Sequence, residues 1–334
     1  MQRNQAMWRA ITDVPGVHVG QVQDADALTG CTVLVFPEGA AGGVDVSGSA
    51  SGTRELTTLH GWHVTSHIHA ICLAGGSAFG LDAAGGVMQA LEAQGIGYET
   101  RAARVPIVPA AIIYDLGIGS PNRRPDVAMG YAACQAAVAG PVAEGNAGAG
   151  IGATVGKFYG MDHAMKGGVG TASAELDDGV WVGALAVCNA LGDVRDAATG
   201  ALLAGARQSP ESMVLADTAR LLSEGRLLSE RRKPGAEAGS NTTLGVVATN
   251  AELTKPQVEK LAKLAQHGLV KALSPAHTQF DGDTVFAVST GTATGDFTQL
   301  GIVAAELLAV ALARSVTLAG SLAGVPGLGD RVVE

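Results

Sequence analysis

The sequence predicts one α/β domain built from layered sheets and helices. Apolar residues make up 47% of the 334 residues and charged residues only 16%, which is typical of a globular chain with a sizeable core. Short β-branched segments and segments with helical periodicity alternate along the whole chain. No stretch separates two halves of different composition, so we expect a single domain over residues 1–334.

Strands are predicted where short apolar runs are rich in β-branched residues, and helices where apolar residues recur every three or four positions. The predicted strands are residues 14–22, 32–36, 69–73, 105–114, 181–188, 244–249 and 284–290. The predicted helices are residues 79–93, 125–139, 255–273 and 300–318. The third helix has the clearest start, because Thr254 suits the N-cap, Pro256 the first turn and Gln257 a capping box.

Charge and apolar patterning argue against several classes of protein. The formal charge is −9 and the 22 basic residues form no stripe with interleaved aromatics, so we expect no nucleic-acid partner. The N-terminal MQRNQAMWRA lacks the apolar core of a signal peptide, and the apolar run 300–313 is too short to span a membrane. We therefore expect a cytoplasmic protein without a membrane partner. The cysteines lack metal-ligand or redox spacing, which favours buried thiols in a reducing compartment. They are Cys31, Cys72, Cys134 and Cys188.

Segment 207–240 breaks the alternation of strands and helices. It contains SPES, LLSEGRLLSERR and KPGAEAGS, so its charge density rises and Pro, Gly and Ser cluster. This composition predicts an exposed, mobile connection, and its Leu-Leu pairs are compatible with a short helix. The segment ends directly before Asn241 and Thr242, within GSNTTLGVVATN, where a core strand begins.

A threonine at such a junction becomes a strong nucleophile if the bond before it is cut. A hydroxyl needs a base to remove its proton, and a new α-amine on the same residue can be that base. With a pKa of about 7.7–8.0, this amine is neutral in roughly one molecule of seven at pH 7, whereas an unperturbed lysine is neutral in about one of a few thousand. Cleavage between Asn241 and Thr242 would thus create nucleophile and base together. Taken alone, however, Asn-Thr-Thr before a strand is more typical of an ordinary turn.

Several long segments, in the same order along nearly the whole chain, resemble the L-aminopeptidase/D-esterase (DmpA-type) family of self-processing N-terminal-nucleophile hydrolases. This family includes β-aminopeptidases and nylon-oligomer hydrolases. The matching segments are ITDVPGVHVGQ (11–21), HAICLAGGSAFGLDAA (69–84), AAIIYDLG (110–117), GNAGAGIGATVGK (145–157), GALAVCNALGDV (183–194), GSNTTLGVVATN (239–250) and HTQFDGDTVFAVSTG (277–291).

The resemblance implies a fold, a processing event and an assembly. The fold is a four-layer αββα sandwich of the DmpA/ornithine-acetyltransferase type. Autocleavage before Thr242 would give fragments 1–241 and 242–334, which stay associated. Family members form homo-oligomers, commonly tetramers, here of cleaved heterodimers, and the resemblance implies neither a cofactor nor a metal.

Residue by residue, the resemblance also implies an active site. Thr242 would be the nucleophile, with its own amine as the base. Asn189 would donate a hydrogen bond to the developing oxyanion, and Tyr114 would help line that site, because fixed amide or phenol donors stabilise such charge. Lys157 would lie near Thr242 and either favour its neutral amine, because a like charge disfavours protonation, or polarise the nucleophile.

Asp281 and Asp283 would hold the nucleophile and its ammonium. Two aspartates at i and i+2 on a strand share one face, so both can point into one site. The aminopeptidase members resembled here have a serine nucleophile, with a serine and a glutamate at these two positions. Thr242 with Asp-Gly-Asp therefore looks more like the nylon-oligomer-hydrolase branch.

Other motifs favour a structural interpretation. In GNAGAGIGATVGK the P-loop spacing is one residue short, and Phe158 follows Lys157 where a P-loop has Ser or Thr. Ser77 in GGSAFG lacks the glycine that a nucleophile elbow has at +2. Four histidines crowd the segment from 60 to 69 without an HExxH pattern, so we expect no metal site there.

We therefore expect a self-processing amidohydrolase or peptidase that forms an acyl-enzyme on Thr242. Its substrates would be small amides, short peptides or ω-amino-acid oligomers. Two alternatives stay open from the sequence. One is an N-acetyltransferase of the ornithine-acetyltransferase type, which uses the same kind of nucleophile. The other is a ligand-binding protein that kept the fold and lost processing.

Overall fold

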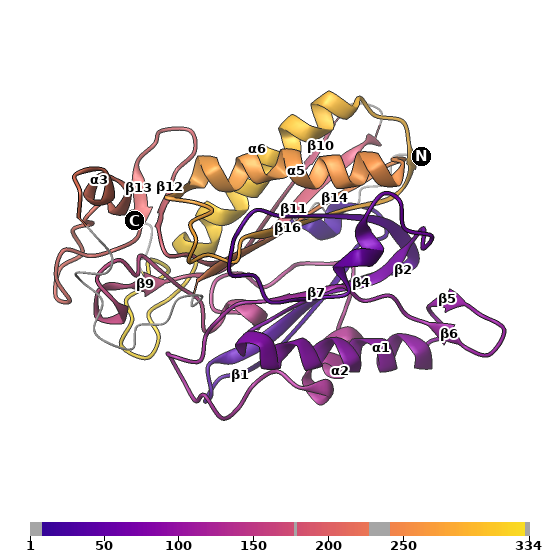
Figure 1. Ribbon diagram of the computed structural model, residues 1–334, viewed down its shortest axis with the longest axis horizontal. Coiled ribbons are helices and arrows are strands. Elements are labelled where there is room, and N and C mark those ends of the chain that lie inside the picture. Colours follow the sequence, from indigo (N-terminus) through magenta and orange to yellow (C-terminus); the bar gives the residue numbers. More distant parts are fainter. Residues whose placement is uncertain (1–8, 177–178, 227–240, 331–334) are drawn as a thin grey trace.

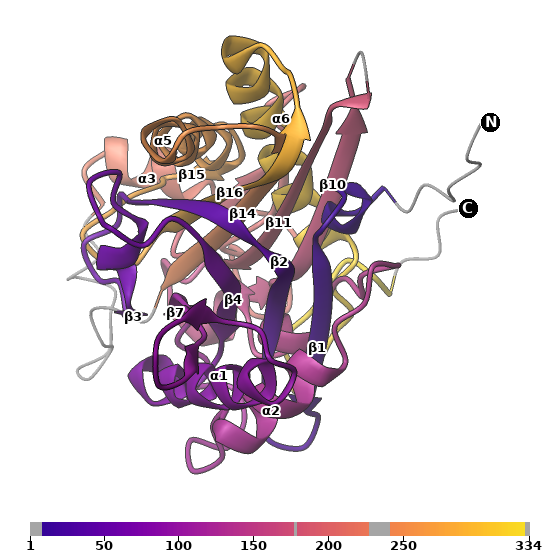
Figure 2. The same ribbon diagram turned by 90° about the vertical axis from the view of Figure 1, so that its right-hand side faces the viewer.

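The computed structural model describes residues 9–176, 179–226 and 241–330 and shows four layers: helices, sheet, sheet, helices (Figures 1 and 2). The α-helices are α1 (Ala83–Ala93), α2 (Val127–Gln135), α3 (Thr218–Ser223), α5 (Lys255–Ala272) and α6 (Phe297–Thr317). Short 3₁₀ helices cover Ile11–Asp13, Leu56–Leu59, Ser77–Asp82, Gly148–Gly150 and Met161–His163. The strands are β1 (His18–Asp24), β2 (Thr29–Val46), β3 (Thr53–Arg54), β4 (Ile68–Ala74), β5 (Tyr98–Glu99), β6 (Arg104–Val105), β7 (Ala110–Ile112), β8 (Thr154–Val155), β9 (Met165–Lys166), β10 (Gly168–Glu175), β11 (Trp181–Asn189), β12 (Asp193–Arg195), β13 (Leu202–Ala204), β14 (Thr242–Ala251), β15 (Leu273–Ser274) and β16 (Thr284–Ala293).

The long strand β2 joins the two central sheets. Its first half pairs antiparallel with β1 and β4, and its last part pairs antiparallel with β16. The register shifts between Val35 and Ala40, where the strand passes from one sheet to the other. One sheet thus has the order β10-β11-β14-β16-β2, and the other contains β1, β2, β4, β7 and β3. Parallel pairs, β14 with β16 and β4 with β7, confirm the predicted α/β class.

Three apolar layers hold the sandwich together. The middle layer lies between the two sheets and includes Phe36, Leu244 and Phe286. The second lies between the β14-containing sheet and α5 and α6, and the third between the other sheet and α1 and α2. Strand β14 serves two of these layers because its side chains alternate: Leu244 faces the middle layer and Val247 faces the helices.

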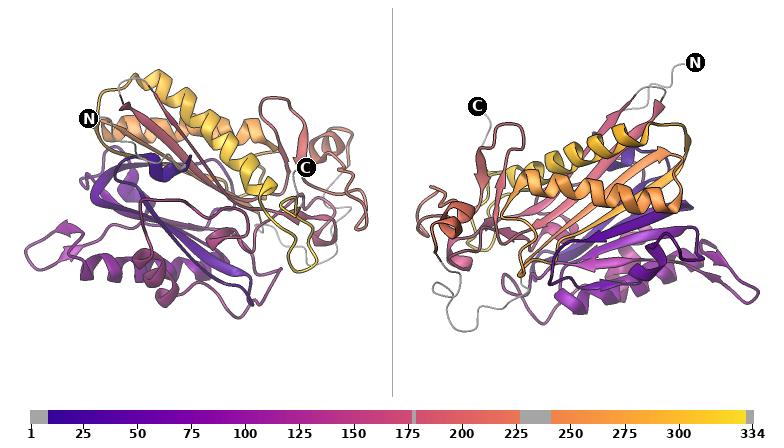
Figure 3. Two further views of the ribbon diagram at one scale, coloured as in Figure 1. Left: turned by 180° about the vertical axis from the view of Figure 1, so that it is seen from behind. Right: turned by 45° about the horizontal axis from the view of Figure 1, so that its top comes forward.

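Helices α5 and α6 lie side by side over the β14-containing sheet (Figure 3). The predicted capping box is present, since the N–H of Thr254 donates to Gln257 Oε1 at 2.9 Å. Helix α6 is long and apolar enough to cross a membrane by length and composition, but about half of it is buried in the protein. It packs across β10 and β11, which fits the predicted buried helix.

Strand β10 was missed by the sequence prediction because glycines weaken the β-pattern. A Cβ on Gly170 would fall 1.9 Å from the carbonyl oxygen of Ala311 in α6. Glycine is required there because the helix backbone lies directly on the strand. The signal for a strand was therefore lost to a contact that the sequence does not display.

Other predicted boundaries were wrong for local reasons. The predicted strand 32–36 lies in the first half of β2, which continues through Gly42 and Gly43. The predicted strand 105–114 is divided into β6 and β7, because the prolines between them cannot donate a ladder hydrogen bond. The helix predicted at 79–93 starts as a 3₁₀ turn, and that at 125–139 shortens to α2.

Over residues 207–226 the segment predicted as an exposed connection is exposed at many positions, and the predicted short helix is confirmed, but parts of it are buried. Arg207 is buried, and the first Leu-Leu pair lies in α3, where Leu221 packs into a small apolar cluster. The rest of the segment, 227–240, lies outside the described residues.

Candidate active site

Thr242 is the first residue of β14 and lies between two other chain segments. On one side it pairs with Asn189, the last residue of β11. On the other side the preceding residue, Asn241, forms a parallel bridge with Asp281. Thr242, Asn189, Asn241 and Asp281 are all at most 2% exposed, so the end of a core sheet carries an unusually polar, buried cluster.

The peptide group before Thr242 is held by two donors. The Thr242 hydroxyl donates to the carbonyl oxygen of Asn241 at 2.6 Å. The backbone N–H of Gly282 donates to the same oxygen at 2.9 Å. Both donors lie in the buried interior, and the hydroxyl is therefore held on the peptide group that the family resemblance implies is cleaved.

Asn189 is fixed in one orientation by its neighbours. Its Oδ1 accepts from Lys157 Nζ at 2.8 Å and from the N–H of Thr154 at 3.1 Å. Its Nδ2 donates to the backbone carbonyl of Tyr114 at 3.2 Å. Donors on one side and an acceptor on the other determine which amide atom is nitrogen. The side chain is thus able to present a fixed N–H donor.

Lys157 and Tyr114 reach the site through Asn189. The Lys157 ammonium also donates to the backbone oxygen of Asn189 at 3.0 Å, and its side chain is buried. It therefore lies beside the residue that pairs with Thr242. Tyr114 is half-buried, and its contact with Asn189 is through the main chain.

Asp281 is buried, and burial raises its pKa to about 6, with the negative charge of Asp283 acting in the same direction. The positive charge of Lys157 acts in the opposite direction. One carboxylate oxygen accepts from the N–H of Leu191 at 3.1 Å, and the other accepts from the Thr278 hydroxyl. This carboxyl group is therefore part of the same electrostatic unit as Lys157.

Asp283 holds Thr243 and His277. Its Oδ1 accepts from the N–H of Thr243 at 2.9 Å, and its Oδ2 lies 3.0 Å from both the backbone nitrogen and Nδ1 of His277. The prediction that the two aspartates share one face of a strand needs correction, since β16 begins only at Thr284. They lie in the turn before the strand, and each carboxylate holds a different segment.

The structure brings Thr242, Asn241, Asn189, Lys157, Asp281 and Asp283 to one end of the β14-containing sheet, with Tyr114 alongside. Sequence reasoning missed Gly282 and His277. Both lie inside the segment HTQFDGDT, so the segment gave the place but not the atoms. A backbone N–H leaves no mark in a sequence, and a single histidine has no spacing to interpret.

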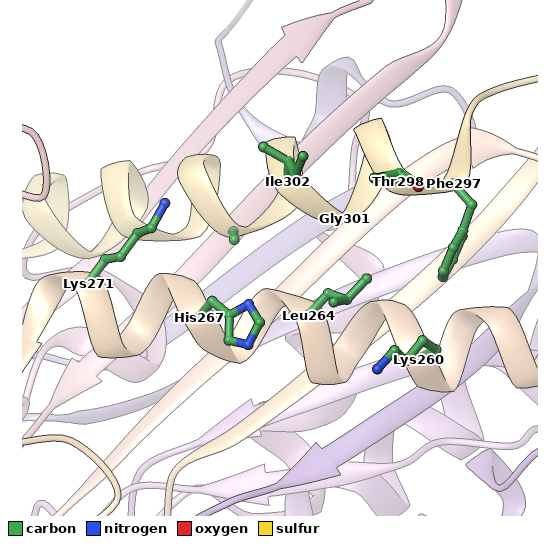
Figure 4. A pocket seen from close by; sticks show the side chains of 9 residues that line it. Lys260, Leu264, His267, Lys271, Phe297, Thr298, Gly301 and Ile302 are labelled. Carbon is green, nitrogen blue, oxygen red and sulfur yellow. The ribbon is translucent and has the colours of Figure 1, made fainter.

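Other polar features serve the fold. Lys166 Nζ donates to the carbonyls of Ile151 and Ala153 at 2.7 and 2.8 Å, which fixes the glycine-rich stretch that resembles a P-loop. In the histidine-rich segment, His69 Nδ1 accepts from the N–H of Ile107. A groove of about 380 Å³ lies between α5 and α6, and none of the predicted site residues lines it (Figure 4).

Comparisons with known proteins identify the family of this chain. The model of "Peptidase family S58" matches residues 9–328. An uncharacterized aminopeptidase of Mycobacterium leprae (strain TN) is 40% identical over 96% of this chain and 93% of its own length. A 6-aminohexanoate-oligomer endohydrolase of Kocuria sp. (strain KY2) is 35% identical over 83% of this chain and 74% of its own length.

A solved structure confirms the fold. The L-aminopeptidase D-Ala-esterase/amidase from Ochrobactrum anthropi, described as a variant of the Ntn hydrolase fold, has a TM-score of 0.69. It is 19% identical, and the match covers 96% of this chain and 88% of that one. The predicted αββα sandwich is therefore correct. With its family model matched almost from end to end, the chain belongs to peptidase family S58 and is a hydrolase of amide bonds.

Proposed function

We propose that this peptidase is a self-processing amidohydrolase whose nucleophile is Thr242 and whose general base is the amine that processing exposes. One observation carries the proposal: the Thr242 hydroxyl lies 2.6 Å from the carbonyl oxygen of the peptide bond to be cut. A hydroxyl on the residue after a peptide bond can attack that bond's carbonyl carbon within the chain, without a second molecule.

Self-cleavage proceeds in two balanced steps. In the first, Thr242 Oγ bonds to the carbonyl carbon of Asn241, the C–N bond breaks, and the hydroxyl proton ends on the Thr242 nitrogen. The result is an ester and a free amine. In the second step, water cleaves the ester, leaving a carboxylate on Asn241 and restoring the threonine hydroxyl. The chain is then two fragments, 1–241 and 242–334.

Turnover uses the same hydroxyl on a substrate amide. The neutral amine of Thr242 takes the hydroxyl proton as Oγ attacks the substrate carbonyl, and it returns the proton to the leaving amine. Water then hydrolyses the acyl-enzyme. In this scheme Asn189 donates to the oxyanion beside Tyr114, and Lys157 favours the neutral amine. Asp281 and Asp283 hold the segments around Thr242.

The sheet explains why the fragments would stay together. Strand β14 belongs to fragment 242–334, but it pairs along its length with β11 of fragment 1–241. Strand β16, also in the smaller fragment, pairs with β2 of the larger one. Cutting one bond at the end of β14 leaves these ladders and the apolar layers intact. The proposal includes a homo-oligomer, a tetramer of such heterodimers, and a cytoplasmic location.

For the substrate, we propose small amides, short peptides or ω-amino-acid oligomers. Thr242 followed by the Asp281-Gly282-Asp283 turn resembles the nylon-oligomer-hydrolase branch, and a relative named 6-aminohexanoate-oligomer endohydrolase is 35% identical. Hydrolysis of such an oligomer in the absence of an acceptor amine would also separate a hydrolase from an acetyltransferase.

Intact-mass measurement of denatured protein tests the proposal. We expect wild type to give two fragments that meet between Asn241 and Thr242, and Thr242→Ala to stay whole at 33.5 kDa and inactive. Thr242→Ser keeps a hydroxyl and should still be cut, which controls for loss of the fold. A wild-type chain that stays uncut yet hydrolyses amides would overturn the proposal.

A further inference from the structure

We propose that the backbone N–H of Gly282 is the oxyanion donor for self-cleavage, and that substrate turnover uses a different donor, Asn189. This inference rests on the proposed function, since it assigns a role within the cleavage of the bond before Thr242. It concerns a main-chain atom and therefore adds a group to the site that no side-chain pattern predicts.

The Gly282 N–H is hydrogen-bonded to the oxygen that would carry the developing charge. The N–H of Gly282 donates at 2.9 Å to the carbonyl oxygen of Asn241, which is the oxygen that becomes negative when Thr242 Oγ attacks. Among the described residues, the other donor to this oxygen is the Thr242 hydroxyl, which gives up its proton in the same step. Gly282 thus supplies the hydrogen bond that persists as charge develops.

This hydrogen bond is buried. Asn241 and Gly282 are buried, and Asp281 is 2% exposed, so water does not compete for the oxyanion. A hydrogen bond to a developing charge is stronger in such a low-dielectric setting than in water.

The donor N–H is preorganised, because the backbone on both sides of Gly282 is held by hydrogen bonds. The backbone oxygen of Asp281 accepts from the N–H of Ala50 at 3.0 Å. The backbone oxygen of Asp283 accepts from the N–H groups of Ser47 and Gly48 at 3.1 and 3.0 Å. A donor that is already in place needs no reorganisation when the transition state forms.

Glycine itself is required at this position. A Cβ on residue 282 would fall 2.6 Å from Thr242 Oγ1 and 2.7 Å from the carbonyl oxygen of Ala50. A side chain would therefore push the turn away from the nucleophile, and with it the donor N–H. Asn189, by contrast, contacts Thr154, Lys157 and Tyr114 on the other side of β14.

The two donors imply that processing and turnover can be separated. During processing the oxyanion belongs to the enzyme's own Asn241, which is bridged to the Asp281–Asp283 turn. After cleavage, the substrate carbonyl approaches Thr242 from the side of Asn189. Removing the Gly282 N–H should slow the first reaction far more than the second.

Replacing one backbone amide by an ester tests this inference. Cell-free translation with a suppressor tRNA carrying glycolic acid replaces the N–H of residue 282 by oxygen without adding a side chain. The matched control is the same ester at Gly200, an exposed turn residue whose N–H donates to the Asp196 carbonyl. Mild alkaline cleavage at the ester verifies incorporation in each chain, and the fraction cut before Thr242 is followed over time.

We expect the Gly282 ester to be cut on the order of 10²-fold more slowly than wild type, and the Gly200 ester at the wild-type rate. Per cut chain, amide hydrolysis by the Gly282 ester should fall far less than its rate of self-cleavage. Equal cutting of all three chains would overturn the inference and leave the proposed function intact. If none of the three is cut, the proposed function fails instead. A Gly282 ester that stays uncut but has lost the protease resistance of the Gly200 ester also counts against the inference, because the peptide group would then be structural.

Discussion

Two groups of buried charges in this molecule look alike until their partners are compared. The site cluster consists of the charged residues Lys157, Asp281 and Asp283 together with the neutral Thr242 and Asn189. The frame charges are Asp193, at the start of β12, and Lys166, at the end of β9. Burial raises the pKa of Asp193 to about 6, as it does for Asp281, and burial lowers the pKa of Lys166 to about 7.

The partners separate the two groups. Asp193 accepts from the N–H of Ala206 at 2.8 Å and from the N–H of Thr218 at 2.6 Å, so it fastens the chain that leads into α3. Lys166 is bound to two main-chain carbonyls, and the negative charge of Asp115 favours its charged form. The site charges also act on one another, but they differ in that Lys157 holds Asn189, the strand partner of Thr242, and Asp283 holds its chain neighbour Thr243. A displaced pKa alone therefore does not identify a catalytic group, and what distinguishes the site cluster is that its contacts lead to the residues around Thr242.

Replacing the buried lysine of the site should give the largest effect on activity. We expect Lys157→Met to lower amide hydrolysis on the order of 10³-fold, because Asn189 loses its charged partner and Thr242 loses a nearby positive charge. The rate is measured per cut chain. Thermal stability, followed in a Thr242→Ala background that keeps the chain whole, should also fall, because the buried oxygens of Asn189 lose a donor, so the loss of rate per folded, cut chain is the result specific to the site. An active Lys157→Met enzyme would remove Lys157 from the site cluster.

The matching change in the frame should lower the free energy of unfolding without a comparable loss of activity. Lys166→Met leaves the carbonyls of Ile151 and Ala153 buried without their donor, so we expect the free energy of unfolding to fall by about 3 kcal/mol. Denaturant unfolding of the Thr242→Ala chain measures this change. Activity per folded, cut chain should stay within a few-fold of wild type. If Lys166→Met were stable but inactive, the distinction between frame and site would be lost.

Local signals explain why half of this arrangement could be predicted. Strand β14, predicted to begin two residues later than it does, and the start of α5 were found because a β-branched run and a capping box are properties of consecutive residues. The frame was not found, since Lys166 and Asp193 owe their roles to carbonyls and N–H groups that carry no sequence mark. Strand β10 was not predicted because its glycines are required by close contact with the backbone of α6, which the sequence does not display.

The site residues were predicted from the family resemblance more than from the chemistry of the individual residues. Asp281 meets Leu191 across 90 residues of chain, and neither residue alone indicates the other. The segments around Thr242, Asn189 and Asp281 could be quoted from the sequence, but their meeting depends on the order of strands in the sheet. Gly282 shows the limit most clearly, because the atom that contacts Asn241 is common to nearly every residue type.

The smallest expected effect concerns pH and the frame carboxyl group. A carboxyl whose pKa is raised on folding contributes stability that is complete below the unfolded pKa, near 4, and lost as pH rises through the folded pKa, near 6 for Asp193. As the pH rises from 5 to 7, ionisation of Asp193 should therefore lower the free energy of unfolding by about 1 kcal/mol. In Asp193→Asn this part of the pH dependence disappears, although the variant is less stable at every pH, because an amide nitrogen faces the N–H donors.

Denaturant unfolding at the two pH values, again in the Thr242→Ala background, measures the difference directly. Asp281, whose pKa is also raised, contributes equally to both chains and cancels in the comparison. Asp196→Asn is the control, since hydrogen bonds from the Thr199 backbone lower the pKa of this exposed carboxyl and move its titration below this range. An unchanged pH dependence in Asp193→Asn would mean that Asp193 titrates like an exposed aspartate, and the frame would then rest on its hydrogen bonds without any cost of buried charge.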